Sequence, residues 1–97
     1  MPIHPIQPVP PKQYFGKYRG IVLNHTDPLQ LGRILAQIPG LSVNTNWAVP
    51  CLPCVGTHGV LALPPIGTDV WIEFEQGNID YPIWSGCFWT QGQPPLL

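Results

Sequence analysis

The sequence has few charged residues: they make up 9% of its 97 positions, four basic and five acidic, where ordinary usage is about 25%. A net charge of -1 without a basic cluster predicts no positively charged surface that would attract a phosphate backbone or anionic lipids. The sequence also lacks an apolar run near the ~20 residues of a membrane span, and its N-terminus lacks the pattern of a signal peptide. We therefore expect a protein made in the cytoplasm, with neither nucleic acid nor a membrane as a stable partner.

Three cysteines are an odd number, which excludes a fully paired disulfide framework. Fourteen prolines exclude long helices, because each interior proline costs a helix about 3 kcal/mol. The 44% hydrophobic content and four tryptophans argue against intrinsic disorder, which needs the opposite balance. A chain of 97 residues is long enough for one small domain with a modest core.

Proline is concentrated at the two ends, which divides the chain into an arm at 1–15, a domain at 16–89 and a tail at 90–97. The composition of the arm favours extended polyproline II structure, which has no internal hydrogen bonds. Such segments are often frayed termini, but we favour arms that dock on partners. The residues predicted to bind a partner are Pro2, Ile3, Pro5, Ile6, Pro8, Val9, Pro10 and Pro11.

Between the arms, apolar residues recur with the two-residue period of strands. Strands are predicted at 18–24, 32–38, 60–63, 69–75 and 83–89. Ile34, Ala36 and Ile38 alternate with Arg33, Leu35 and Gln37, and Val70, Ile72 and Phe74 face away from Asp69, Trp71, Glu73 and Glu75. Residues 41–59 are predicted to form a long connection with a turn of helix. Five short strands separated by proline and glycine turns favour an all-β fold, a small five-stranded barrel of the OB type.

One cluster of residue types suggests a metal. Cys51 and Cys54 form a C-x-x-C pair, and with His58 and Cys87 they would make a Cys₃His zinc site. A single C-x-x-C is a weak signal, so we favour structural cysteines, with Cys87 buried in a strand as a small hydrophobic residue. A redox pair is a third interpretation, but no helix follows Cys54 to lower a thiolate pKa. No metal and no cofactor are expected.

Other residues suggest no catalysis. Glu73 and Glu75 share one face of a predicted strand, where a carboxylate pair could act as acid and base, but a solvated face is the simpler interpretation. The histidines have no nucleophile beside them in a recognisable array, and a phosphate-binding glycine loop is missing. Trp71 and Tyr18 could stack on bases, as in OB domains that bind single strands, but the basic groove is missing. We expect no enzyme.

The order of the motifs resembles one OB-fold family. The segments that carry the likeness are YRGIV at 18–22, DP at 27–28, LGRI at 31–34, PG at 39–40, NWAVPC at 46–51, LPPIGTDVWIEFE at 63–75 and GNIDYPIWSG at 77–86. In this order they look like the OB domain of contractile phage tail-spike (tail lysozyme) proteins and of VgrG spikes of type VI secretion and related injection systems. Glycines at 32, 67, 77 and 86 fall at turns or bends, where positive φ is useful.

The resemblance implies a collar that joins the trimeric baseplate hub to a membrane-piercing spike, and it implies that Cys51 is a core residue. Residues 1–15 and 90–97 contain no hub, lysozyme or β-helix sequence, so membrane puncture and cell-wall cleavage are not expected. The expected function is a structural OB adaptor at the hub–spike junction, a homotrimer with Trp71 and Trp89 as possible interface aromatics. It would be assembled in the bacterial cytoplasm and reside in the baseplate. The alternative is an OB module that binds single-stranded nucleic acid.

Overall fold

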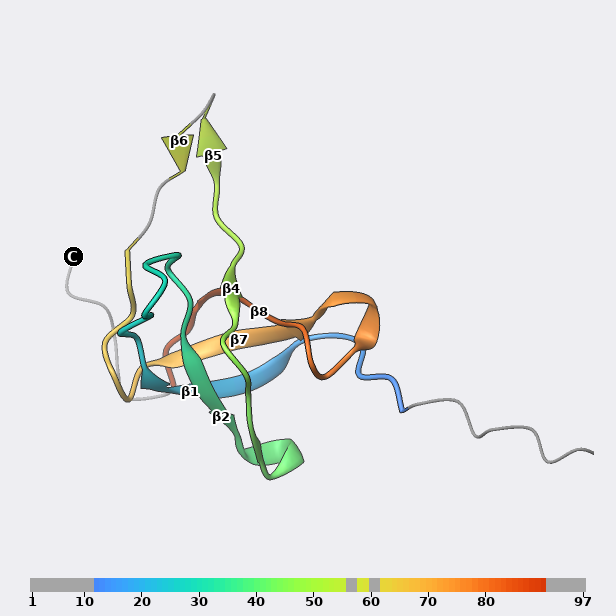
Figure 1. The fold of residues 1–97 in the computed structure, drawn as a ribbon. Helices are drawn as coiled ribbons and strands as arrows, with labels where there is room; N and C mark the ends of the chain where they lie inside the picture. The colour runs from blue at the N-terminus through green and yellow to red at the C-terminus, as the bar shows by residue number, and fades with distance from the viewer. Residues whose placement is uncertain (1–11, 56–57, 60–61, 91–97) are drawn as a thin grey trace, which may run out of the picture.

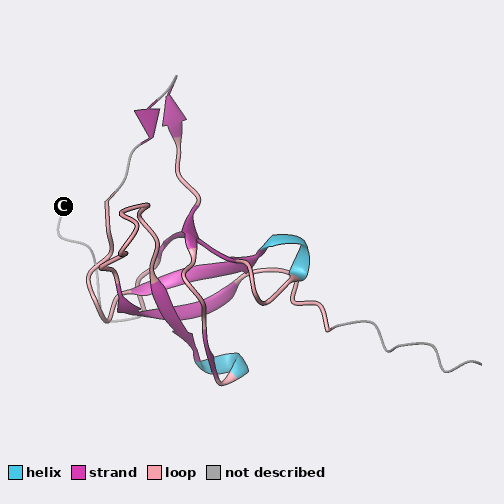
Figure 2. Ribbon diagram, in the orientation of Figure 1, coloured by secondary structure: helices cyan, strands magenta, loops and turns pink. Residues whose placement is uncertain are grey.

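The structure, a computed structural model, describes residues 12–55, 58–59 and 62–90, with the backbone alone at 54–55 and 58–59. The described residues form an all-β fold with two short 3₁₀ turns (Figures 1 and 2). The elements in chain order are β1 (Tyr18–Asn24), β2 (Leu35–Ile38), η1 (Pro39–Leu41), β3 (Val43–Asn44), β4 (Val49–Pro50), β5 (Cys54–Val55), β6 (His58–Gly59), β7 (Asp69–Phe74), η2 (Glu75–Gly77) and β8 (Pro82–Cys87).

Six of the strands form one sheet in the order β3-β2-β1-β7-β8-β4, and β5 pairs with β6 in a separate hairpin. The ladders do not close into a ring, but β3 and β4, at the two ends of the order, belong to one continuous segment at 43–50. The first part of this segment runs antiparallel to β2, and its last part runs parallel to β8. Between them, an isolated bridge joins Ala48 to Ile34, next to β2. Counted by segments, the predicted five-stranded OB arrangement is therefore present.

The core follows from alternation along the strands. Val70, Ile72 and Phe74 point inward from β7, and Ile34, Ala36 and Ile38 point inward from the β2 region, as the two-residue period predicts. Val22, Ala48 and Trp84 complete the buried hydrophobic core. Burial of a large aliphatic or aromatic side chain contributes about 1.5–3 kcal/mol, so this cluster is the main stabilising feature of the barrel.

Several strand boundaries in the structure differ from those predicted from the sequence. β7 ends at Phe74, so that Glu75 lies in η2, and β8 ends at Cys87. The segment at 41–59 contributes strands to the barrel, and the helical turn that was predicted within it lies at its start, at Pro39–Leu41. Residues 62–63 are not in a strand, and the rest of the strand predicted at 60–63 lies outside the described residues. The arm residues 1–11 and the tail residues 91–97 also lie outside them.

The segment before β1 and the segment after β8 lie at opposite ends of β7 (Figure 1). The backbone N–H of Tyr14 donates to the carbonyl of Gly77, just beyond the last residue of β7. The backbone N–H of Phe88 donates to the carbonyl of Asp69, the first residue of β7. Gly77 has a φ of +77°, and a Cβ there would come within 3.0 Å of the Phe15 ring, so this crossing of the chain requires glycine.

Candidate interaction surfaces

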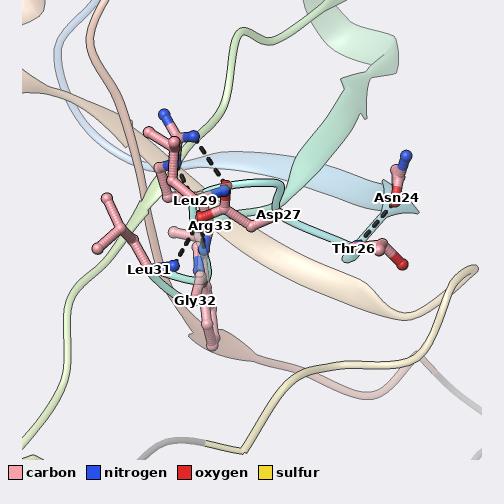
Figure 3. A network of polar contacts seen from close by, with 8 residues as sticks. Asn24, Thr26, Asp27, Leu29, Leu31, Gly32 and Arg33 are labelled. Carbon is pink, nitrogen blue, oxygen red and sulfur yellow. Dashed lines mark hydrogen bonds and ion pairs between the residues drawn. The ribbon is translucent and has the colours of Figure 1, made fainter.

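The loop between β1 and β2 is organised around one buried carboxylate. Asp27 is 7% exposed and accepts hydrogen bonds from the backbone N–H groups of Leu29, Leu31 and Arg33. The Arg33 guanidinium adds a bidentate pair, with Nε 2.9 Å from Oδ2 and Nη2 2.8 Å from Oδ1. Figure 3 shows the loop wrapped around this carboxylate. The hydrogen bond from Arg33, together with the backbone donors and against the effect of burial, holds the pKa of Asp27 well below its usual range.

This ordered loop presents apolar side chains to solvent. Leu29 and Leu31, which flank the carboxylate, are 63% and 59% exposed. The segment at 63–68 lies against the same end of the barrel, because the Gly67 N–H donates to the Val22 carbonyl. Large exposed hydrophobic residues at this end, which we call the loop-end patch, are Leu29, Leu31, Leu63, Ile66 and Trp89. Rigid exposed apolar groups of this kind mark surfaces that bind other proteins.

Trp71 lies on the outer face of the sheet in a preformed stack. Its ring centroid is 4.4 Å from that of Phe88, and the Arg19 guanidinium lies over both rings, at 5.8 Å from Trp71 and 5.2 Å from Phe88. Arg19 and Trp71 are direct partners in the β1–β7 ladder, which accounts for the contact. Trp71 is therefore half-buried, with ring contacts inside the chain, whereas Trp89 is 67% exposed.

All four basic side chains of the sequence contact a group within the chain. Lys12 lies over the Tyr14 ring, Arg19 over the Trp71–Phe88 stack, Lys17 pairs with Glu73, and Arg33 pairs with Asp27. A groove for single-stranded nucleic acid needs cations that face the backbone phosphates together with exposed stacking rings. The internal partners of these cations and the half-buried Trp71 ring do not favour such a groove at the stack.

The fold agrees with a comparison against known families. Residues 18–89 match the model of the type VI secretion system/phage-baseplate injector OB domain. The chain belongs to this family. No curated protein matches the chain. The family resemblance expected from the order of motifs is confirmed, and the matched residues begin and end within two residues of the predicted limits of the domain.

In this injector OB domain Glu73 and Glu75 do not share one face of a strand. Glu73 lies on β7 and forms an ion pair with Lys17, with Nζ 2.8 Å from Oε1, while Glu75 is exposed in η2. Hydrogen bonds from Lys17 and Ser85 lower the pKa of Glu73, with burial opposing them. A general acid at neutral pH needs the opposite shift. The interpretation as a solvated face is the one the geometry favours.

The zinc candidates are not brought together as a group in the described residues. Cys51 and Cys87 are both exposed free cysteines, so the expectation of a buried Cys87 and of a Cys51 in the core was wrong. Cys51 lies just past β4, whose two residues are themselves exposed or half-buried, and Cys87 is the last residue of β8, three positions beyond the buried Trp84. Desolvation still raises the pKa of the Cys87 thiol. Cys54 pairs with Gly59 in the β5–β6 hairpin, and the side chains of Cys54 and His58 lie outside the described residues.

A groove runs beside the joint between β4 and β8, and sequence reasoning missed it. Its walls are formed by Leu35, Trp47, Val49 and Tyr81, and its acidic residues are Glu75 and Asp80; we call it the side groove. Tyr81 is 59% exposed and Val49 47% exposed. Arg33 also lines the groove, and its guanidinium lies 5.5 Å from the centroid of the Trp47 ring.

The Asp27 network was also missed, although a signal for it exists. Aspartate followed by proline within a cluster of turn residues is the composition of a side-chain-capped turn. That signal predicts the backbone contacts to Leu29 and Leu31. The pair with Arg33 depends on how the whole loop closes, which periodicity does not describe.

Proposed function

We propose that this injector OB domain is a structural adaptor at the junction between the hub and the spike of a contractile tail or injection-system baseplate. In this proposal the barrel at 16–89 is the rigid body, and the arm at 1–15 and the tail at 90–97 tether it to separate hub and spike chains. It works as a homotrimer within the larger assembly, formed in the bacterial cytoplasm. Its task is mechanical and no catalytic step is assigned to it.

One observation carries the proposal beyond the family. The described chain leaves the barrel at the two ends of β7, so connections on its two sides would reach neighbours in opposite directions. The loop-end patch lies at one of these ends, where two of its residues, Ile66 and Trp89, line one hollow with Phe88. Low charge, internally paired cations and exposed apolar groups suit a surface that is largely covered by other proteins in its final state.

The test is recovery of the tagged full-length protein from its native source, followed by sedimentation and mass spectrometry. We expect it in a very large particle together with tube, sheath, hub and spike proteins. A small species that carries RNA or DNA would overturn the proposal in favour of the nucleic-acid module.

A matched pair of variants tests the patch. Leu29→Ser with Leu31→Ser should reduce incorporation into the particle, since both side chains are exposed and contribute little to the core. Gln37→Ser, at an exposed position on β2, should incorporate normally. Equal incorporation of both variants would exclude the patch as a contact.

A further inference from the structure

The side groove has the chemistry of a site for proline-rich segments. Trp47 and Tyr81 offer aromatic surface, Leu35 and Val49 offer aliphatic surface, and the groove is open to solvent. Aromatic-lined grooves of this kind bind polyproline II helices, whose rings pack between the aromatic side chains. Such a helix makes no hydrogen bonds of its own, so its carbonyls need donors, which the Tyr81 hydroxyl and the Trp47 indole N–H can supply.

The chain itself contains a segment with the matching pattern. Proline occupies every third position at 2, 5, 8 and 11, and Ile3, Ile6 and Val9 follow the same period one residue later. A polyproline II helix has three residues per turn, so each set falls along one edge, and the two edges together make an apolar ridge. Residues 2–11 contain no aspartate or glutamate, so nothing in them is repelled by Glu75 and Asp80 of the groove.

We propose that the side groove binds residues 2–11 of a second copy of this chain in the polyproline II form. The arm of each copy would thereby join it to a neighbouring copy. The proposed function tethers the arm to a hub or spike chain, whereas this proposal gives residues 2–11 a neighbouring copy of the same chain. It rests on that function only for the idea that the arm binds a partner.

The direction of the chain favours a second copy over the groove of the same copy. Tyr14 is fixed to Gly77 by its backbone N–H, and Lys12 lies beside the turn at 76–80. At this described end the chain points away from the sheet (Figure 1). Ten residues of polyproline II helix span about 31 Å at 3.1 Å per residue, which exceeds the ~20 Å length of a six-residue strand. The segment is therefore long enough to cross to an adjacent barrel.

The first test mixes two full-length variants with complementary defects. The double variant Pro5→Ser, Pro8→Ser removes two prolines of the apolar ridge and leaves the groove intact. Tyr81→Ala removes one aromatic wall of the groove and leaves the ridge intact. By sedimentation we expect the unmodified protein to associate with rising concentration, each variant alone to remain monomeric, and an equal mixture to form dimers. A mixture that associates no better than its components would overturn the proposal, as would variants that associate like the unmodified protein.

The second test uses a synthetic peptide of residues 1–12 against the Pro5→Ser, Pro8→Ser protein, with the Trp47 indole resonance followed by NMR. Tyr81→Ala should weaken peptide binding by about tenfold, equivalent to about 1.4 kcal/mol. Trp89→Ala, at an exposed aromatic residue outside the groove, should leave it unchanged.

Two further outcomes would also overturn the proposal. Absence of peptide binding overturns the proposal. So does a monomeric unmodified protein whose Trp47 resonance moves on substitution of the arm, because the arm would then occupy the groove of its own copy. Both tests use purified protein, so their failure would leave the baseplate proposal standing, and absence from the baseplate would not affect their result.

Discussion

Asp27 and Arg33 form a bidentate ion pair inside the β1–β2 loop, with the carboxylate almost completely shielded and the guanidinium extended on to the Trp47 ring. One residue therefore joins the loop that carries part of the loop-end patch to a wall of the side groove. Disturbing the pair is expected to affect both surfaces.

Asp27→Asn should lower the melting temperature clearly. The amide cannot carry the charge that Arg33 faces, and one of its two polar atoms is a donor where the loop supplies only donors. Thermal unfolding followed by circular dichroism measures the effect. Glu73→Gln is the matched control: its pair with Lys17 is solvent-exposed and should cost only about 0.2–1 kcal/mol. Equal losses in the two variants would contradict this ranking.

The same carboxylate predicts acid sensitivity. The pKa of Asp27 is lower in the folded chain than its ordinary value near 3.9, so the ionised form stabilises the fold. That contribution is fully present above the ordinary pKa and is lost as pH falls through the folded one. Urea unfolding between pH 7 and pH 2 should show stability falling below about pH 4. The fall should be smaller in Asp27→Asn, and identical slopes for the two proteins would refute the assignment.

Trp84→Phe should cost about 1–3 kcal/mol, since it leaves a buried acceptor without its donor. The indole N–H of Trp84 donates to the Gly32 carbonyl at 3.0 Å, in a site where the side chain is 4% exposed. Chemical denaturation measures the change. Trp89→Phe, on an exposed ring, should stay within about 0.5 kcal/mol of the unmodified protein. A Trp84→Phe protein as stable as that control would show that the Gly32 carbonyl finds another donor.

Gly20→Ala should destabilise the barrel by about 1–3 kcal/mol through overpacking. A Cβ at Gly20 would lie 2.8 Å from Cγ1 of Ile72, a fully buried core residue on the neighbouring strand. Gly40→Ala is the control, because a Cβ there meets nothing within 4 Å and the backbone is not in the left-handed region. That variant should be neutral or stabilised by up to about 1 kcal/mol. The reverse order of the two variants would contradict the packing argument.

The sequence was sufficient to predict those features of the fold that follow a local pattern. The alternation around Ala36 and Ile72 predicted which faces of their strands are buried, because a strand's two-residue period leaves no other choice. The glycines at 32, 67, 77 and 86 all have positive φ, as their places at turns predicted. The order of motifs predicted the family.

Features that depend on contacts between distant segments could not be predicted from the sequence. The side groove joins Trp47 to Tyr81, and neither residue has a pattern that points to the other. The exposure of Cys87 depends on where β8 ends, two residues before the predicted end of that strand. Cys51 follows β4, which was not predicted as a strand. Trp71 was identified as a possible interface residue, but its stack with Phe88 and Arg19 arises from strand register.

The positions where the chain leaves the barrel have a mechanical consequence. β1 and β8 both run antiparallel to β7 and flank it, and the chain enters β1 near one end of β7 and leaves β8 near the other. A pull between these two points would slide β1 and β8 along β7 in opposite directions. The ladder hydrogen bonds lie across the strands, so such a force would load them together in shear instead of opening them one after another. A barrel connected in this way transmits tension through its strongest direction.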